Sequence, residues 1–485
     1  MKKLFLLFTF IFSLFTLCMA QTPVFYGMTY RGGTNNLGTI INFNPANNSE
    51  SVVWNFGGIG DGQEPWGSLI YVKSRHAFYG FTETGGVYTY GTIIKFNPTN
   101  NQESVAWSFG YGTDGQSPYG NLAYDPVNGM LYGMTAFGGT AGAGTIIEFN
   151  PVNGQESVVW NFGSHFDGAI PKGSLVYDTA SGCFYGMTSI HGLWGYGAII
   201  RFNPVTNQDS VVWSFGMNND GEYPNGSLVY DTTTHLFYGM TNAGGGTGTG
   251  IIFSFNPVNN VENLLWNFGS GSDGQIPNGD LVYNKNNGLF YGMTSTGGAN
   301  NYGAICSFNP TNNAENVAWS FMLGGMDGIT PWGDLTYDPI NGLFYAMTDG
   351  LGYGNIIRFD GATNTDTLVW SFGNGYDGVN PYGNLTFYNP ANLGVNEVEE
   401  ESEKVKVFPN PSNGIFQIQA NGRQLMATSQ IEVYNSVGQK VYSNSQITAS
   451  SNFQIDLSGQ PAGIYFYRIL SGEEGIISQG KLIIN

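Results

Sequence analysis

Seven aspartates, each followed directly by glycine, are the most repeated residues of this 485-residue sequence that could carry out chemistry. They are Asp61, Asp114, Asp167, Asp220, Asp273, Asp327 and Asp377, and each has a proline within the next four residues. An Asp at the head of a turn accepts backbone N–H groups, and the Gly after it can adopt a positive φ. General acid–base catalysis needs one asymmetric pair of acids, whereas these carboxylates recur in every copy. We therefore interpret the Asp-Gly pairs as turns, and a ring of cation-binding carboxylates is the alternative.

The remaining residues that could carry chemistry occur singly. No pair among the four histidines has the spacing of metal ligands. No Gly-x-Ser-x-Gly motif is present, and no helix that could bind phosphate follows the Gly-Gly pairs. Cys183 and Cys306 are the two cysteines after residue 20, and we interpret them as isolated small apolar residues. The sequence thus predicts no catalytic residues, no metal site and no cofactor.

The elements that position these residues are repeated along the chain. One Trp recurs seven times, at intervals of 53 residues five times and 51 residues once, at Trp54, Trp107, Trp160, Trp213, Trp266, Trp319 and Trp370. Tyr-Gly-Met-Thr or a close variant recurs in phase with it, beginning at Tyr26, Tyr79, Tyr132, Tyr185, Tyr238, Tyr291 and Tyr345. Seven copies of one unit therefore fill residues 24–388.

One copy, residues 173–215, contains four short runs rich in Val, Ile, Tyr, Phe or Trp and bounded by turn residues. The runs cover residues 174–178, 183–188, 198–203 and 210–215, and none has the 3.6-residue period of a helix. Four strands in a unit of about fifty residues fit one blade of a β-propeller. A stacked β-solenoid is the alternative.

The two ends of the repeat array favour the propeller. The array begins with the second strand of a unit, at residues 24–29, and ends with an extra first strand, at residues 383–388. Together these ends make one complete blade, which closes the ring and removes the exposed sheet edges of an open array. We predict an all-β fold, a seven-bladed β-propeller closed by a terminal strand.

A ligand site is expected where the copies differ, because structural positions repeat. In a propeller, the loop before each first strand shares one face with the loop after each second strand. The residue after the proline of the first of these loops reads Trp66, Tyr119, Lys172, Asn225, Asn278, Trp332 and Tyr382. Ring closure makes the four aromatics contiguous, and they could stack on a glycan, with Trp194 as a further contact. The alternative is that these rings only pack over the joints between blades.

The unit resembles a known family. Leu-Tyr-Gly-Met-Thr, then Gly-Gly, then Gly-Thr-Ile-Ile-x-Phe at residues 131–149 resemble the GloVer tandem repeat of exported bacterial proteins. The resemblance covers residues 24–388 and implies a propeller-like array. It brings no assigned activity and no catalytic residues.

The N-terminus predicts export. Lys2 and Lys3 precede an apolar run that ends at Leu17, which is too short to span a membrane, so residues 1–20 are expected to be a cleaved signal peptide. A lipoprotein site at Cys18 is the alternative. The remainder holds 14 basic and 35 acidic residues, and this charge excludes nucleic acids and anionic membranes as partners. Residues 21–390 would form the propeller.

The C-terminal part has a different character. Five glutamates between residues 397 and 403 indicate a solvated linker, taken as residues 391–404. Short strands in residues 405–485 predict a small β-sandwich. This module resembles the type A sorting domain of the type IX secretion system of Bacteroidetes, and an attached adhesion module is the alternative. The matching residues include Pro409, Asn410, Pro411, Gly414, Gly438, Gly463, Tyr465 and Lys481.

The resemblance of the C-terminal module implies transfer by the type IX secretion machinery to the outer cell surface or the medium. We expect a monomeric, surface-displayed binding or adhesion propeller with a polysaccharide as ligand and no insertion into a membrane. An enzyme that degrades extracellular polysaccharide and a purely structural surface protein are the alternatives.

Overall fold

The computed structural model describes residues 22–110, 113–163, 166–217, 219–270, 272–324, 328–349, 353–373, 376–390, 405–420, 429–435, 438–447, 453–471 and 475–485. The signal peptide predicted at residues 1–20 and the linker predicted at residues 391–404 lie outside these ranges. The chain divides into two compact units, Met1–Ala391 and Asn392–Asn485. No helix in the described ranges combines the length and the apolar character needed to cross a membrane.

Seven antiparallel sheets built on one plan occupy the described part of the first unit. The first strands are β35 (Thr386–Tyr388), β5 (Ile70–Val72), β11 (Ala123–Tyr124), β16 (Val176–Asp178), β21 (Val229–Asp231), β27 (Val282–Asn284) and β31 (Thr336–Tyr337). The second strands are β1 (Val24–Thr29), β6 (Ala77–Thr82), β12 (Leu131–Thr135), β17 (Cys183–Thr188), β22 (Leu236–Thr241), β28 (Leu289–Gly297) and β32 (Phe344–Thr348). The third strands are β2 (Thr39–Asn44), β8 (Thr92–Asn97), β14 (Thr145–Asn150), β18 (Ala198–Asn203), β24 (Ile251–Asn256), β29 (Ala304–Asn309) and β33 (Asn355–Asp360). The fourth strands are β3 (Ser49–Asn55), β9 (Gln102–Ser108), β15 (Gln155–Asn161), β19 (Gln208–Ser214), β25 (Val261–Asn267), β30 (Ala314–Ser320) and β34 (Thr365–Ser371).

Short elements lie in the loops between these sheets. Six two-residue strands in these loops pair two by two: β4 (Gly62–Gln63) with β7 (Thr84–Gly85), β10 (Gly115–Gln116) with β13 (Phe137–Gly138), and β20 (Gly221–Glu222) with β23 (Ala243–Gly244). β26 (Gly274–Pro277) pairs with β28, and a single 3₁₀ turn, η1, covers Lys73–Arg75. The predicted all-β class is confirmed by these elements and by the near absence of helix in the described residues.

The core lies between consecutive sheets. The second strands are buried along their length, because both of their faces contact neighbouring sheets, whereas the fourth strands alternate between exposed and half-buried residues. Phe81 and Ile93 of the second sheet share one buried cluster with Leu131 and Ile147 of the third. Consecutive sheets are therefore held together by interdigitating Phe, Ile, Leu and Tyr side chains.

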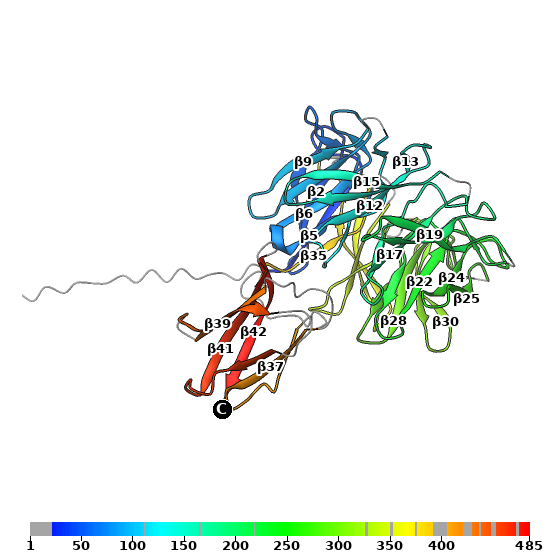
Figure 1. Ribbon diagram of the computed structural model, residues 1–485. Helices are drawn as coiled ribbons and strands as arrows, with labels where there is room; N and C mark the ends of the chain where they lie inside the picture. Colours follow the sequence, from blue (N-terminus) through cyan, green and yellow to red (C-terminus); the bar gives the residue numbers. More distant parts are fainter. Residues whose placement is uncertain are drawn as a thin grey trace, which may run out of the picture. The chain divides into compact units, whose positions relative to one another are not determined.

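The first and last parts of the repeat array meet in the first sheet. β35 pairs antiparallel with β1, with Val24 opposite Tyr388 and Tyr26 opposite Thr386. In Figure 1, β35 is labelled beside the blue strands β5 and β6 of the N-terminal region. A buried cluster also joins Phe25 of the first sheet to Met347 of the seventh. The order of strands in this sheet is β3-β2-β1-β35.

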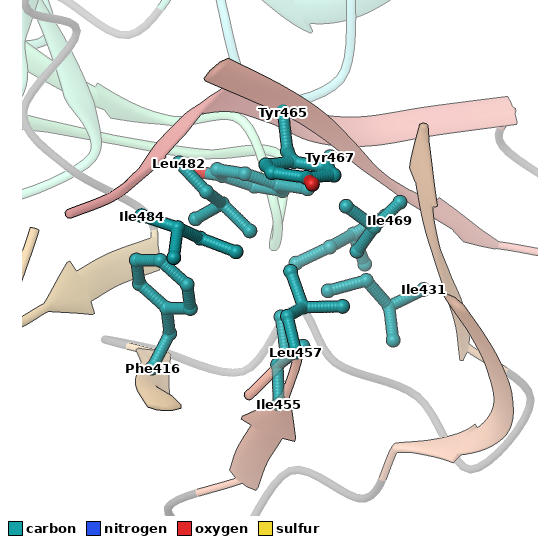
Figure 2. Close-up of a cluster of buried hydrophobic side chains, with 10 residues drawn as sticks. Phe416, Ile431, Ile455, Leu457, Tyr465, Tyr467, Ile469, Leu482 and Ile484 are labelled. Atoms are coloured by element: carbon teal, nitrogen blue, oxygen red, sulfur yellow. The ribbon is translucent and has the colours of Figure 1, made fainter. Parts of the chain in front are cut away.

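The C-terminal unit has two sheets around one core. β36 (Val405–Phe408), β37 (Ile415–Ala420) and β40 (Phe453–Asp456) form the first sheet. β39 (Lys440–Ile447), β38 (Ser429–Asn435), β41 (Gly463–Ser471) and β42 (Gly475–Ile484) form the second, in that order. Figure 2 shows Phe416 and Ile455 from the first sheet gathered with side chains of the second, including Ile431, Ile469 and Leu482.

Candidate functional site

A pocket lies where the seven repeats bring the same three-residue segment together. Each segment follows the proline of the Asp-Gly loop and consists of a variable residue, a Gly and a Ser, Asn or Asp. All seven variable residues singled out in the sequence line this pocket, on the residues just before the first strands.

Glycines form the tightest layer of the pocket. A Cβ atom placed on Gly173 would lie 2.1 Å from the carbonyl oxygen of Gly226, and one on Gly120 would lie 2.3 Å from that of Gly173. The contact continues from Gly383 to the carbonyl oxygen of Gly67, at 2.3 Å. Such distances leave no room for a side chain, so this close approach of backbone to backbone requires glycine.

A circuit of hydrogen bonds follows the glycines. In each repeat, a backbone N–H donates to a side-chain oxygen of the next repeat, as from Ser174 to Ser227 Oγ at 2.9 Å. The last of these bonds runs from the N–H of Asn384 back to Ser68 Oγ, at 2.5 Å. The seven residues are, in order, Ser68, Asn121, Ser174, Ser227, Asp280, Asp334 and Asn384. A continuous ring of backbone N–H groups, each paired with a side-chain oxygen, therefore lines the pocket.

The structure brings four of the five predicted ligand residues together. The ring centroids of Trp66 and Tyr382 are 4.5 Å apart, those of Trp66 and Tyr119 5.4 Å, and those of Trp332 and Tyr382 6.3 Å. Trp332 is 42% exposed and the other three are half-buried. We call these four residues the aromatic arc. Trp194 is 45% exposed in the loop between β17 and β18 and does not line the pocket.

A second tier of residues, which the sequence analysis missed, supports the arc. The Tyr30 ring lies 5.5 Å from that of Trp66 and 5.2 Å from that of Tyr382, and the Tyr119 hydroxyl donates to Glu83 Oε1 at 3.1 Å. Burial, and then the negative charge of Glu83, raises the pKa of Tyr119 to about 12. The available signal was the variable residue directly after the Tyr-Gly-Met-Thr motif, which is Tyr30 in the first repeat and Glu83 in the second.

The other half of the pocket is polar. Asn225 Nδ2 donates to Asn278 Oδ1 at 3.3 Å, and Asn242 Nδ2 donates to the same oxygen at 2.7 Å. Lys172 is exposed to solvent, yet the surrounding pocket wall partly desolvates its ammonium group and lowers its pKa. The pocket therefore offers apolar rings on one side and hydrogen-bonding groups with one cation on the other.

Six of the seven Asp-Gly pairs lie in described loops between consecutive sheets, and Asp327 lies outside the described residues. The predicted turn with a positive φ at the glycine is wrong in four copies, because Gly62, Gly115, Gly221 and Gly274 begin the short strands β4, β10, β20 and β26. Gly168 and Gly378 do have a positive φ.

Asp114 accepts the backbone N–H of Gly115 at 2.7 Å and the indole N–H of Trp107 at 3.1 Å. For the six described Asp residues, a second acid on the fourth strand of the next sheet lies close by. Burial, and then the charge of Asp114, raises the pKa of Glu156 to about 8. Asp61 has the same effect on Glu103, whose pKa is raised to about 9.

The sorting-motif residues tie the start of the C-terminal unit to its last strand. Asn410 Oδ1 accepts the N–H of Ile483 at 2.9 Å, and Asn410 Nδ2 donates to the carbonyl of Lys481 at 2.6 Å. The Gly414 carbonyl accepts the N–H of Leu457 at 2.7 Å, and the buried Tyr465 donates to the carbonyl of Pro461 at 2.7 Å. Pro409, Pro411, Gly438 and Gly463 lie in the turns and strand ends of the same unit.

Solved structures share the fold of the repeat unit. A candidate 6-phosphogluconolactonase from Bacteroides fragilis is 14% identical, with a TM-score of 0.52 over 75% of this chain and 98% of that one. A second one, from Bacteroides uniformis, is 14% identical, with a TM-score of 0.51 over 76% and 100%. At this identity the likeness shows the fold alone, a propeller-like all-β architecture. No curated protein matches the chain.

Family comparisons cover both units. The Gloeobacter/Verrucomicrobia repeat matches residues 16–189 and 179–408, and the secretion system C-terminal sorting domain matches residues 406–485. The sorting domain implies interaction with the type IX secretion machinery, which takes its cargo to the cell surface or the medium. The chain therefore belongs to the Gloeobacter/Verrucomicrobia repeat family and carries a type IX secretion sorting domain at its C-terminus.

Proposed function

We propose that the seven sheets are the blades of one closed seven-bladed β-propeller, in which β35 completes the first blade. The pairing of β35 with β1 and the hydrogen-bond circuit that returns from Asn384 to Ser68 support this proposal. The Thr386 hydroxyl also donates to the Leu69 carbonyl of the second sheet, at 2.6 Å. Deletion of residues 377–388 should expose a sheet edge and the core beneath it, which lowers the melting temperature. An unchanged melting temperature would contradict closure.

We propose further that the pocket binds a carbohydrate and that the protein acts as a surface-displayed binding or adhesion protein. The observation that carries this proposal is the aromatic arc, four contiguous rings on one side of a single pocket. Sugar rings present apolar C–H faces that stack on aromatic rings, and their hydroxyls bind amide groups such as those of Asn225 and Asn278. Rigid aromatic side chains supply this contact area at a low entropic cost.

The competing interpretation is that the arc only packs, since its rings contact one another and Tyr30. Trp332→Ala separates the two, because this side chain is 42% exposed. A binding role predicts a nearly unchanged melting temperature and a loss of glycan affinity of about tenfold. Trp194→Ala is the matched control, since Trp194 is 45% exposed outside the pocket. A large loss of stability without a loss of glycan affinity would show that the aromatic arc only packs and does not bind the glycan.

The experiment is a screen of the purified full chain against polysaccharides, which records both binding and the release of products. Binding without release supports the proposal, release supports a polysaccharide-degrading enzyme, and neither supports a structural surface protein. Asp280 and Asp334 are the two carboxylates of the pocket, and both accept backbone N–H groups of the circuit. This use as structural acceptors favours binding over acid–base catalysis.

We also propose that residues 1–20 are removed on export, that residues 391–404 link the two units, and that residues 405–485 are needed for export and not for folding of residues 21–390. The separate buried cluster of the C-terminal unit supports this division. In a type IX secreting host, a chain stopped at Val395 should stay in the periplasm. Its appearance outside the cell at normal levels would contradict the proposal.

A further inference from the structure

One thiol interrupts the repeated core. Cys306 lies on β29 opposite Gly292 of β28, and it is 3% exposed. The corresponding position of the other six sheets is bulky and apolar, with Ile41, Ile94, Ile147, Ile200, Phe253 and Ile357. The sixth sheet alone therefore places a metal-ligating atom at this position of the repeat.

Two carboxylates face this thiol. The Sγ atom of Cys306 and one carboxylate oxygen each of Asp273 and Glu315 all lie within 4.8 Å of one another. Asp273 directly precedes β26, which pairs with β28 of the sixth sheet, and Cys306 and Glu315 also belong to the sixth sheet. The indole of Trp266 on β25 links Asp273 to the fifth sheet, so the cluster lies where the two sheets meet. Trp266 Nε1 at 3.1 Å and the N–H of Gly274 at 2.7 Å hold the Asp273 carboxylate in place.

The cluster contains a buried acceptor without a partner. Glu315 is a half-buried residue whose Oε1 atom is buried and has no hydrogen-bond partner among the described residues. The equivalent acids Glu50, Glu103, Glu156 and Glu262 share this feature, but among the described residues only Glu315 belongs to a cluster with a thiol. Within those residues, Asp273 and Glu315 also take part in no ion pair. Buried acids need a proton or a cation as partner, and a bound cation would satisfy all three donor atoms at once.

We propose that Asp273, Cys306 and Glu315 bind a divalent transition-metal ion, of which Zn²⁺ is the representative. A set of one thiolate and two carboxylates suits a borderline-soft ion and disfavours Ca²⁺, which takes six to eight oxygen ligands. Three protein ligands leave a fourth tetrahedral position for water. Typical Zn–S and Zn–O distances of about 2.3 and 2.1 Å place tetrahedral donor atoms about 3.5 Å apart, so the three donor atoms, which lie within 4.8 Å of one another, would close in by about 1.3 Å at most. The bound ion would fasten the fifth sheet to the sixth.

Cobalt substitution tests this site in the full chain. With one equivalent of Co²⁺ and a reductant that does not chelate metals, we expect a thiolate-to-cobalt charge-transfer absorption, one ion per chain, and displacement by Zn²⁺. Cys306→Ile, which restores the residue of five sibling sheets, should abolish the absorption. Cys183→Ala should keep it, because Cys183 is the other buried thiol and belongs to no such cluster among the described residues.

Two results would overturn the proposal: no thiolate absorption with wild-type protein, or equal absorption with Cys306→Ile. If Cys306→Ile fails to fold, as judged by its circular dichroism, Glu315→Gln carries the test, because it removes one ligand and keeps the side-chain size. A loss of at least tenfold in Co²⁺ affinity is expected for that variant, and an unchanged affinity would reject the site.

Discussion

Glu103 of the repeat unit and Glu432 of the C-terminal unit are both acids on β-strands, but their surroundings differ. Glu432 is 5% exposed and lies 3.0 Å from Lys440 Nζ and 2.7 Å from an Arg468 guanidinium nitrogen. The Tyr434 hydroxyl donates to it at 2.6 Å. Hydrogen bonds from these three groups hold the pKa of Glu432 at about 2. In this unit, the cations compensate the buried charge.

In the repeat unit, Glu103 instead faces Asp61, and its Oε1 is buried without a hydrogen-bond partner among the described residues. The same arrangement recurs in the other copies whose Asp-Gly loop the structure describes, and burial followed by the charge of an Asp raises the pKa of Glu50, Glu156 and Glu262 to about 8. Near neutral pH, Glu50, Glu103, Glu156 and Glu262 therefore carry a bound proton in place of a cationic partner. In a repeated sequence, an acid without a cationic partner occurs again in other copies. In a module that occurs once, the acid can be paired with specific cations, as Glu432 is with Lys440 and Arg468.

The largest expected effect comes from the glycines that line the pocket of the repeat unit, most of which pack more tightly than the described glycines of the C-terminal unit. Gly173→Ala should destabilise the repeat unit by about 3 kcal/mol or more, because the new Cβ would lie 2.1 Å from the Gly226 carbonyl oxygen. Chemical denaturation followed by tryptophan fluorescence measures this. Gly459→Ala in the C-terminal unit has nothing within 4 Å of its Cβ and should change stability by less than about 0.5 kcal/mol. Equal effects would refute the close approach.

The pH dependence of stability should have opposite signs in the two units. For Glu103 the folded-state pKa of about 9 lies above its ordinary value of 4.5, so its contribution is complete below pH 4.5 and is lost as the pH rises through 9. The repeat unit should thus melt at a lower temperature at pH 9 than at pH 5. All ten tryptophans lie between residues 54 and 370, so their fluorescence follows the repeat unit alone. Glu103→Gln should reduce the dependence, and a melting temperature that rises with pH would contradict it.

Glu432 predicts the reverse for the C-terminal unit. Its folded-state pKa of about 2 lies below its ordinary value of 4.5, so its contribution is present above pH 4.5 and is lost as the pH falls toward 2. Glu432→Gln should destabilise the unit by about 2 kcal/mol near neutral pH, because three charge-assisted hydrogen bonds weaken. Hydrogen exchange of β38 and β41 in the full chain measures this. Protection that is the same at pH 3 and pH 6 would show that the network contributes nothing.

The smallest effect concerns a surface pair of the repeat unit. Arg31 lies 3.5 Å from Glu64, and its side chain is half-exposed. Arg31→Ala should cost at most about 0.5 kcal/mol, because water screens such pairs. Thermal melting in low and high salt checks this value. A loss of stability as large as that of Glu432→Gln would mean that solvent exposure does not explain the different strengths of the ion pairs of Arg31 and of Glu432.

The strand plan could be predicted from residue types, and its deviations have physical causes. The runs predicted at residues 183–188 and 198–203 coincide with β17 and β18. The first strand, predicted at residues 174–178, is only Val176–Asp178, because Ser174 donates its backbone N–H to the hydrogen-bond circuit. A local pattern of apolar residues cannot reveal a bond to a residue 53 positions away.

The residues of the candidate site that share one variable repeat position were predicted from the sequence. Those that depend on contacts between repeats were missed. The arc was predictable because its four aromatics share a position after a proline. Tyr30 and Glu83 depend on which loops lie side by side, and Trp194 is placed elsewhere by its own loop. Cys306 has no apparent partner in the sequence, since Asp273 precedes it by 33 residues, and only the folded joint brings the two together.

The hydrogen-bond circuit can be completed only late in the synthesis of the chain. Asn384, whose N–H completes it at Ser68, is made 316 residues after that partner, so contacts of very high sequence separation wait for the last part of the repeat unit. The sorting domain is made directly afterwards, from residue 406 onward. A chain broken off during synthesis before Asn384 lacks both the completing bond and the sorting domain. Incomplete chains therefore lack the domain that interacts with the type IX secretion machinery.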